Sequence, residues 1–295
     1  MIDDDDADDF DDEVPAAKPT APARIIDFPA HVFRAYDIRG IVPDELDEDL
    51  VTRIGRAIGT LAGELEQKAL IVGCDGRQTS PAIKNNLVKA LLDSGRDVID
   101  IGVVPTPLLY YATCTLSTQS GIMVTGSHNP PEYNGLKITI NGAPLAGDDI
   151  VALRDRVAEG KFSEGAGRLV KQDLRSEYID TIVSDMAIAA PLKIVGDAGN
   201  GVAGGVAPQL LEEMGCEVIP LYCDVDGSFP NHHPDPSIDA NLADLQAKVR
   251  EEGADFGVAY DGDGDRIGVI DGHRAEERRE GKRGGGGGAG GRATA

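Results

Sequence analysis

Three aspartates follow an apolar run directly and could hold a metal ion. Asp261, Asp263 and Asp265 alternate with two glycines in the segment AYDGDGDRIGV. Carboxylates this close repel one another unless a cation neutralises them, and their hard oxygens suit Mg²⁺ or Ca²⁺. The spacing does not fit an EF-hand loop, because Arg266 and Gly272 stand where that loop needs Gly and a bidentate Glu. An exposed acidic turn is the alternative, since Asp-Gly is common in turns.

A second candidate site lies in GIMVTGSHNPPEYNGLK, where an apolar strand runs into a polar turn. Ligands of open α/β sheets collect beyond the carboxyl ends of the strands, so Ser127 and His128 stand where reactive groups are displayed. A nucleophile and its base are not implied, because neighbouring side chains on an extended backbone diverge. A plain turn made by Gly126 and Pro130 is the alternative.

Two further segments could bind anions. Arg34 and Arg39 lie in HVFRAYDIRGIVP, and arginine forks bind phosphate oxygens in pairs, although surface arginines are also common. The segment DAGNGVAGG, residues 197–205, resembles a glycine loop that cradles phosphate. It has neither the Walker lysine nor a strict G-x-G-x-x-G pattern, so it indicates nucleotide binding only weakly.

The elements that must position these residues alternate between strand and helix. The run ALIVGCD (69–75) predicts a strand, and residues 80–95 predict a helix that begins at Ser-Pro and ends at Gly95. The alternation continues to about residue 159, and a second series begins with LKIVGDA at residues 192–198. This pattern predicts two consecutive α/β domains.

We place these domains at residues 25–173 and 174–272, between two segments that we expect not to pack. Residues 1–24 join an acidic run to a Pro/Ala stretch and predict a disordered leader. Residues 273–295 predict a low-complexity Gly/Arg tail, since they contain no Val, Ile, Leu, Phe or Tyr. The abrupt change suggests a truncated or frame-shifted sequence.

Composition favours chemistry on small molecules. The 295 residues carry a net charge of −23, and such a body repels nucleic acid and anionic membranes. With no basic signal peptide and no run of about 18 apolar residues, the sequence predicts a cytoplasmic protein. The cysteines form no CxxC pair and lie in apolar stretches, which predicts buried, reduced thiols and no zinc site at Cys74, Cys114, Cys216 and Cys223.

The segments FRAYDIRG, TGSHNPPEYNGLK, DAGNG, GSFPNHHPDP and DGDGDR occur in the order typical of the α-D-phosphohexomutase family. Over about residues 28–272 the chain resembles that family, and most closely its bacterial phosphomannomutase/phosphoglucomutase branch. The resemblance implies the first two of four mixed-sheet α/β domains around a cleft. The family's third and fourth domains, with their sugar-selecting and phosphate-gripping loops, have no counterpart in the sequence, so we expect a truncated chain with depressed or lost turnover.

The resemblance also implies the metal and the phosphoryl carrier. Ser127 matches the family's phosphoserine, and Asp261, Asp263 and Asp265 match its Mg²⁺ ligands, with an oxygen of the phosphoserine completing the set. We therefore expect Ser127 and the three aspartates to meet across a crevice between the domains, with a divalent ion between them.

The implied reaction is an Mg²⁺-dependent interconversion of mannose (or glucose) 1-phosphate and 6-phosphate, with hexose 1,6-bisphosphate as intermediate and activator. Phosphoglucosamine mutase and a non-catalytic, truncated metal-binding phosphoprotein are the alternatives, and the sequence predicts no oligomeric state. His128 or a neighbour is expected to accept a proton from the attacking hydroxyl, Arg39, Lys137 and Arg266 to balance phosphoryl charge, and Tyr36 to line the substrate site.

Overall fold

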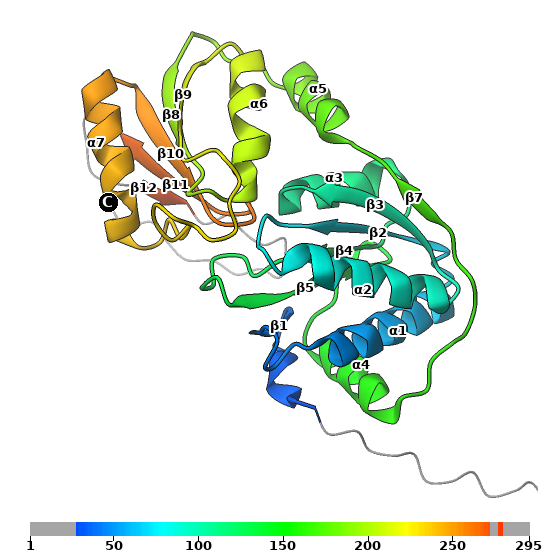
Figure 1. Cartoon of the computed structure of the whole chain (residues 1–295). Helices are drawn as coiled ribbons and strands as arrows, with labels where there is room; N and C mark the ends of the chain where they lie inside the picture. Colours follow the sequence, from blue (N-terminus) through cyan, green and yellow to red (C-terminus); the bar gives the residue numbers. More distant parts are fainter. Residues whose placement is uncertain (1–27, 272–276, 280–295) are drawn as a thin grey trace, which may run out of the picture.

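The computed structural model describes residues 28–271 and 277–279 and shows two α/β units side by side (Figure 1). The expected leader, residues 1–24, lies outside the described residues. The expected tail, residues 273–295, contains one described element, the strand β12 (Glu277–Arg279), which pairs antiparallel with β11 (Ile267–Asp271). This strand lies within the range that we expect not to pack, and strand pairing uses backbone hydrogen bonds that need no apolar side chain.

The first unit is built on a mixed seven-stranded sheet in the order β1-β5-β4-β2-β3-β7, with β6 paired to β5. The strands β4, β2, β3 and β7 run parallel, whereas β5 is antiparallel to both β4 and β1. The carboxyl ends of β2 and β4 therefore lie at one edge of the sheet. The strands are β1 (Ile38–Ile41), β2 (Ala69–Cys74), β3 (Asp97–Val103), β4 (Gly121–Val124), β5 (Tyr133–Ile140), β6 (Ala143–Pro144) and β7 (Leu169–Lys171).

Helices cover both faces of this sheet. One face packs against α1 (Glu48–Glu64), α2 (Ser80–Asp93) and α4 (Asp148–Glu159), and the other packs against α3 (Thr106–Thr115) (Figure 1). The Asp47 side chain caps α1 by accepting a hydrogen bond from Leu50 N at 2.8 Å. Glycines on α1 let it approach α2 closely, since a Cβ at Gly55 would lie 2.6 Å from the Cβ of Ala90.

The second unit has a five-stranded sheet in the order β12-β11-β10-β8-β9, in which β8 runs parallel to both β9 and β10. The helix α7 covers one face and α6 covers the other. The short 3-10 helices η1 (Ala30–Val32), η2 (Val202–Gly205) and η3 (Asp239–Leu242) lie in loops. The remaining elements are β8 (Lys193–Asp197), β9 (Glu217–Leu221), β10 (Phe256–Tyr260), α6 (Ala207–Glu213) and α7 (Ala243–Glu252).

The helix α5 (Arg175–Asp185) connects the two units and contacts both α3 and α6. On the side of the first unit, the Tyr111 hydroxyl lies 2.9 Å from Thr181 Oγ1 and the Tyr111 ring packs edge-on against Tyr178. The predicted fold of two mixed-sheet α/β units is confirmed. Across the described stretches, no helix combines the length and the apolar character needed to cross a bilayer.

The cysteines are only partly as expected. Cys74 and Cys216 are buried, but Cys114 is exposed and Cys223 is half-buried. The prediction of a buried thiol is wrong for Cys114 because Leu108, Leu109 and Ala112 occupy the inner face of α3, which turns Cys114 outward.

Candidate active site between the two units

The loop after β4 and the loop after β10 meet between the two units. Ser127 Oγ donates a hydrogen bond to Asp261 Oδ2 at 3.0 Å, although the two residues are 134 positions apart. Glycine allows this approach, because a Cβ at Gly262 would lie 2.5 Å from the Ser127 carbonyl oxygen. The expected meeting of Ser127 with the aspartates across the units is therefore confirmed.

The backbone of Ser127 has a left-handed conformation, with φ of 51°. This conformation is uncommon outside glycine, and strain of this kind gathers at functional sites. It brings Ser127 Oγ within 3.3 Å of His128 Nδ1. The expectation that these neighbouring side chains diverge is wrong, because it assumed an extended backbone.

The three aspartates form a compact and largely buried cluster. Their ligand atoms lie within 4.8 Å of one another, with Asp261 and Asp263 buried and Asp265 half-buried. Burial first, and then the charges of Asp263 and Asp265, raise the pKa of Asp261. The alternative of an exposed acidic turn is therefore wrong.

Lys137 on β5 of the first unit reaches across to this cluster. Its Nζ donates to Asp263 Oδ2 at 2.6 Å and to Asp265 Oδ2 at 2.5 Å. Burial opposes the charge of Lys137, but Asp263 and Asp265 outweigh it and raise the pKa of the ammonium group. Burial likewise opposes ionisation of Asp263, but the charge of Lys137 and the hydrogen bonds of Lys137 and Thr106 lower the pKa of this carboxyl.

The cluster has the donor set that a hard divalent cation requires. Asp263 Oδ1 and Asp265 Oδ1 are buried and accept no hydrogen bond from the residues that the structure describes. Arg266 Nε approaches Asp265 Oδ1 only to 3.9 Å. Buried oxygens without a partner are costly unless a ligand compensates them, and carboxylate oxygens are what Mg²⁺ prefers. The residues present therefore fit Mg²⁺.

Basic side chains surround the serine loop, residues 125–133, which leads from β4 into β5. Arg39 is buried, forms an ion pair with Asp37, and donates from Nη1 to Asn129 Oδ1 at 2.7 Å. His128 is half-buried, and its pKa is lowered by burial and then by the charge of Arg266, with a smaller contribution from Arg39. Both arginines therefore act on the region around His128.

One predicted substrate residue, Tyr36, and one predicted anion ligand, Arg34, lie apart from this cluster. Tyr36 is 63% exposed, and Arg34 is exposed on the same segment. The electrostatic contact of Arg34 is with Glu45, a residue outside the serine and aspartate loops. The structure thus gathers Ser127, His128, Arg39, Lys137, Arg266 and the three aspartates, and leaves these two side chains at the surface.

Sequence reasoning missed three residues that hold the site together. Thr106 donates from Oγ1 to Asp263 Oδ2 at 2.5 Å, and His233 Nε2 lies 2.5 Å from the His128 carbonyl oxygen. Arg77, in the loop after β2, is buried against the serine loop. A signal for Arg77 was present, because the sequence Asp-Gly-Arg follows β2 at the same sheet edge as Ser127.

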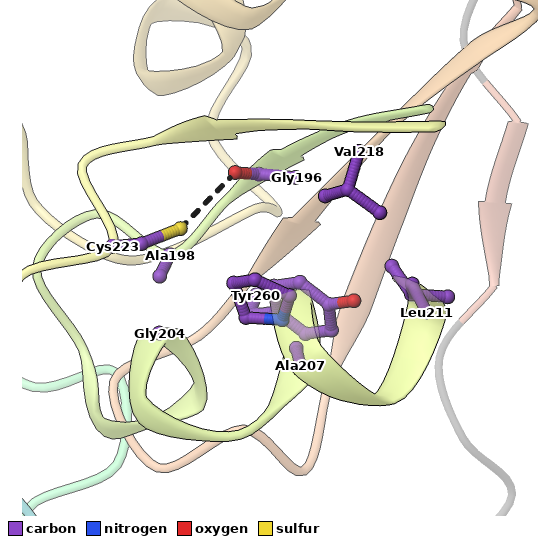
Figure 2. A pocket seen from close by; sticks show the side chains of 9 residues that line it. Gly196, Ala198, Gly204, Ala207, Leu211, Val218, Cys223 and Tyr260 are labelled. Atoms are coloured by element: carbon purple, nitrogen blue, oxygen red, sulfur yellow. Dashed lines mark hydrogen bonds between the residues drawn. The ribbon is translucent and has the colours of Figure 1, made fainter. Parts of the chain in front are cut away.

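A small apolar pocket lies elsewhere in the second unit, between its sheet and α6 (Figure 2). Gly196, Leu211, Val218, Cys223 and Tyr260 line it, and the Cys223 thiol donates to the Gly196 carbonyl at 3.4 Å. Burial raises the pKa of Tyr260 to about 12. No charged side chain lines this pocket, so we do not assign the chemistry to it.

Two family models match most of the chain. The model described as phosphoglucomutase/phosphomannomutase, alpha/beta/alpha domain I, matches residues 30–164, and the model for domain II of the same family matches residues 176–275. The first range ends before α5, and the second begins within its first turn and includes the rest of that helix.

Curated relatives and a solved structure agree with these models. A phosphomannomutase/phosphoglucomutase of Pseudomonas aeruginosa is 52% identical over 242 residues, which are 82% of this chain and 52% of that protein. A phosphoglucomutase of Neisseria meningitidis is 44% identical over 81% of this chain and 52% of its own length. The crystal structure of a phosphoglucomutase/phosphomannomutase family protein from Burkholderia thailandensis, 42% identical, superposes with a TM-score of 0.82 over 85% of this chain and 56% of that one. The chain spans about half the length of the curated relatives it matches.

Proposed function

The chain belongs to the phosphoglucomutase/phosphomannomutase family, and on this premise we propose that Ser127 carries a phosphoryl group and exchanges it with a hexose phosphate. The observation that carries the proposal is the contact of Ser127 Oγ with Asp261 Oδ2 at 3.0 Å, beside two buried carboxylate oxygens that accept no hydrogen bond from the described residues. A serine and a metal-binding cluster gain a joint function only when they are adjacent, and here they come from different units.

We assign the Mg²⁺ site to Asp261, Asp263 and Asp265, together with an oxygen of the phosphorylated Ser127. When bound, the ion supplies positive charge to the phosphoryl oxygens and makes the phosphorus a better electrophile. Lys137 forms ion pairs with two of these carboxylates, Asp263 and Asp265, so its ammonium group competes with the ion for them.

In the transfer, the oxygen of a sugar hydroxyl forms a bond to phosphorus while the bond from phosphorus to Ser127 Oγ breaks, and the freed serine oxygen regains a proton from His128, whose Nδ1 lies 3.3 Å away. His128 accepts the proton of the attacking hydroxyl, because its lowered pKa leaves the imidazole neutral near pH 7. Arg39, Lys137 and Arg266 balance the negative charge of the transferring group. Return of the other phosphate of the bisphosphate to Ser127 then restores the carrier.

The substrate class is taken from the names of the relatives. These are phosphomannomutases and phosphoglucomutases, so we propose mannose (or glucose) 1-phosphate and 6-phosphate as substrates and hexose 1,6-bisphosphate as activator. Tyr36 is exposed on the segment that leads to β1 and is proposed to contact the sugar. Because the match covers about half of each relative, the turnover of this chain is itself a proposal.

The test is phosphoryl uptake. The chain is incubated with glucose 1,6-bisphosphate and Mg²⁺, and intact mass and peptide mapping locate the added phosphoryl group. We expect it on Ser127, with no uptake by Ser127→Ala and normal uptake by Ser184→Ala, a control at an exposed serine of α5. Unchanged uptake by Ser127→Ala would remove the carrier assignment. Uptake without mutase turnover on either sugar phosphate would favour a metal-binding phosphoprotein instead.

A further inference from the structure

Arg77 is the bulkiest fully buried side chain in the described residues, with 1% of its surface exposed, and the proposed reaction gives it no role. It lies in the loop that follows β2, at the sheet edge where β4 leads into Ser127. Long charged side chains are almost never fully buried unless they are paired. Its burial beside Ser127 therefore indicates that Arg77 has a specific role at the site.

The guanidinium group of Arg77 binds four carbonyl groups of the serine loop. Nη2 donates to the Ser127 carbonyl at 2.7 Å and to the Asn129 carbonyl at 2.6 Å. Nη1 donates to the Pro130 carbonyl at 2.6 Å and to the Tyr133 carbonyl at 3.0 Å. A planar fork with fixed donors can hold four acceptors at once, which a flexible ammonium group cannot.

Asp75, the partner of Arg77, holds the same loop through its donors. Arg77 Nε lies 3.2 Å from Asp75 Oδ2 as an ion pair, without the alignment of a hydrogen bond. Asp75 Oδ2 also accepts from Thr125 Oγ1 at 2.8 Å and from Gly126 N at 3.2 Å. The pair therefore binds both the donors and the acceptors of the loop that displays Ser127.

The second unit covers the other side of the guanidinium. The ring of Phe229 lies 5.3 Å from Arg77 Cζ. Phe229 is buried and has φ of 50°, so two side chains with left-handed backbones, Ser127 and Phe229, flank Arg77. Glycines admit the close contact, since a Cβ at Gly227 would lie 2.6 Å from Arg77 Cα and one at Gly126 would lie 2.5 Å from Arg77 Cζ.

We propose that Arg77 is a positioning residue for phosphoryl transfer, held between Asp75 and Phe229. It fixes the four carbonyls so that Ser127 keeps its left-handed backbone and points Oγ at Asp261. The part that concerns transfer rests on the proposed function, whereas the holding of the loop stands independently of it. We call Asp75, Arg77 and Phe229 the clamp. Because Phe229 belongs to the second unit, the clamp is complete only when the two units are docked.

The first test measures the loop itself. Arg77→Lys keeps a positive charge beside Asp75 but removes the planar fork. We expect hydrogen–deuterium exchange across residues 126–133 to accelerate by at least about tenfold, while residues 69–74 of β2 keep their protection. The control is Arg56→Lys, since Arg56 also binds a carbonyl, that of Ser163 at 2.9 Å, and packs on a ring, that of Phe162 at 5.9 Å, away from the site.

Unchanged protection of residues 126–133 in Arg77→Lys, or the same loss in Arg56→Lys, would overturn the proposal. If Arg77→Lys fails to fold, Phe229→Leu decides, because it keeps an apolar side chain and removes only the ring over the guanidinium. We expect it to accelerate exchange in the same segment by a smaller factor, and unchanged exchange in this variant would equally count against the clamp.

The second test separates positioning from a general structural role. We expect Arg77→Lys to slow phosphoryl uptake by Ser127 from glucose 1,6-bisphosphate on the order of tenfold, with the Mg²⁺ dissociation constant within about twofold of wild type, because the carboxylates belong to the other unit. A wild-type rate in a variant with a loosened loop would refute positioning. Wild-type protein that takes up no phosphoryl group would refute the proposed function instead, and exchange alone would then decide whether Arg77 holds the loop.

Discussion

Gly262→Ala tests how closely the two units must approach for the serine and the aspartates to work together. The new Cβ would lie 2.5 Å from the Ser127 carbonyl oxygen, where ordinary contact begins at 3.4 Å, so the loops must separate by about 0.9 Å. The contact of Ser127 Oγ with Asp261 Oδ2 is 3.0 Å, and a separation of that size carries it beyond the reach of a hydrogen bond. Overpacking of this kind costs about 1–3 kcal/mol.

The matched control is Gly196→Ala, on β8 of the same unit. A Cβ at Gly196 meets no atom within 4 Å, and Gly196 lines the apolar pocket (Figure 2). Alanine there is expected to leave stability unchanged or raise it by about 0.4–1 kcal/mol, because it restricts the unfolded chain. Phosphoryl uptake should match wild type in this control.

The assay combines thermal unfolding with the rate of phosphoryl uptake at saturating Mg²⁺. We expect Gly262→Ala to lower Tm by about 2–4 °C for each kcal/mol lost and to slow uptake on the order of tenfold or more. A Gly262→Ala protein with the Tm and the uptake rate of Gly196→Ala would refute the reasoning, because it would show that the loops need not touch.

Three further predictions concern single groups. Lys137→Met removes the ammonium that binds Asp263 and Asp265, so calorimetry should show Mg²⁺ binding tightened on the order of tenfold; an equal or weaker affinity would count against the site. Burial opposes protonation of His232, but the hydrogen bond to Asp197 outweighs this effect and raises the pKa of His232. Protonated His232 therefore stabilises the folded chain fully below about pH 6.5, and this stabilisation is lost as the pH rises through the pKa of His232 in the folded state. The difference in unfolding free energy between wild type and His232→Asn should therefore shrink above that pH, and a difference that stays constant would exclude the assignment. Thiol labelling of the folded chain should begin at exposed Cys114, since burial raises the pKa of Cys223 to about 11 and that of Cys74 to about 12; earlier labelling of either would contradict the burial.

Much of the fold was predictable because apolar periodicity marks elements that bury one face. The strand at residues 69–75 and the helix at residues 80–95 appear in the structure within two residues of their predicted ends. The helix α1 was also predictable, since Leu50, Ile54 and Ile58 recur at helical spacing behind the capping Asp47, but Gly55, Gly59 and Gly63 are poor helix formers. Those glycines are explained only by the closeness of neighbouring side chains in the folded structure, which periodicity does not report.

Part of the candidate site was likewise predictable from the sequence, and part was not. The aspartates were predictable because three carboxylates in five residues need a common charge partner. The contact of Ser127 with His128 was not, because it depends on the left-handed backbone at Ser127, and a serine gives no sign of that conformation in a sequence. The position of Arg77 after β2 was visible in the sequence, but its four partners were not, because they are main-chain carbonyls, which every residue possesses.

The division of the site between two units has a consequence for any dissection of the chain. A fragment ending within α5 would keep the hydroxyl, the imidazole and the ammonium of Lys137, yet lose the carboxylates that give them their setting. The complementary fragment would keep the three aspartates but lose Lys137, the ammonium group that pairs with two of them. Neither fragment would contain a complete site. We expect phosphoryl uptake by Ser127 only when the two fragments are mixed and bind each other.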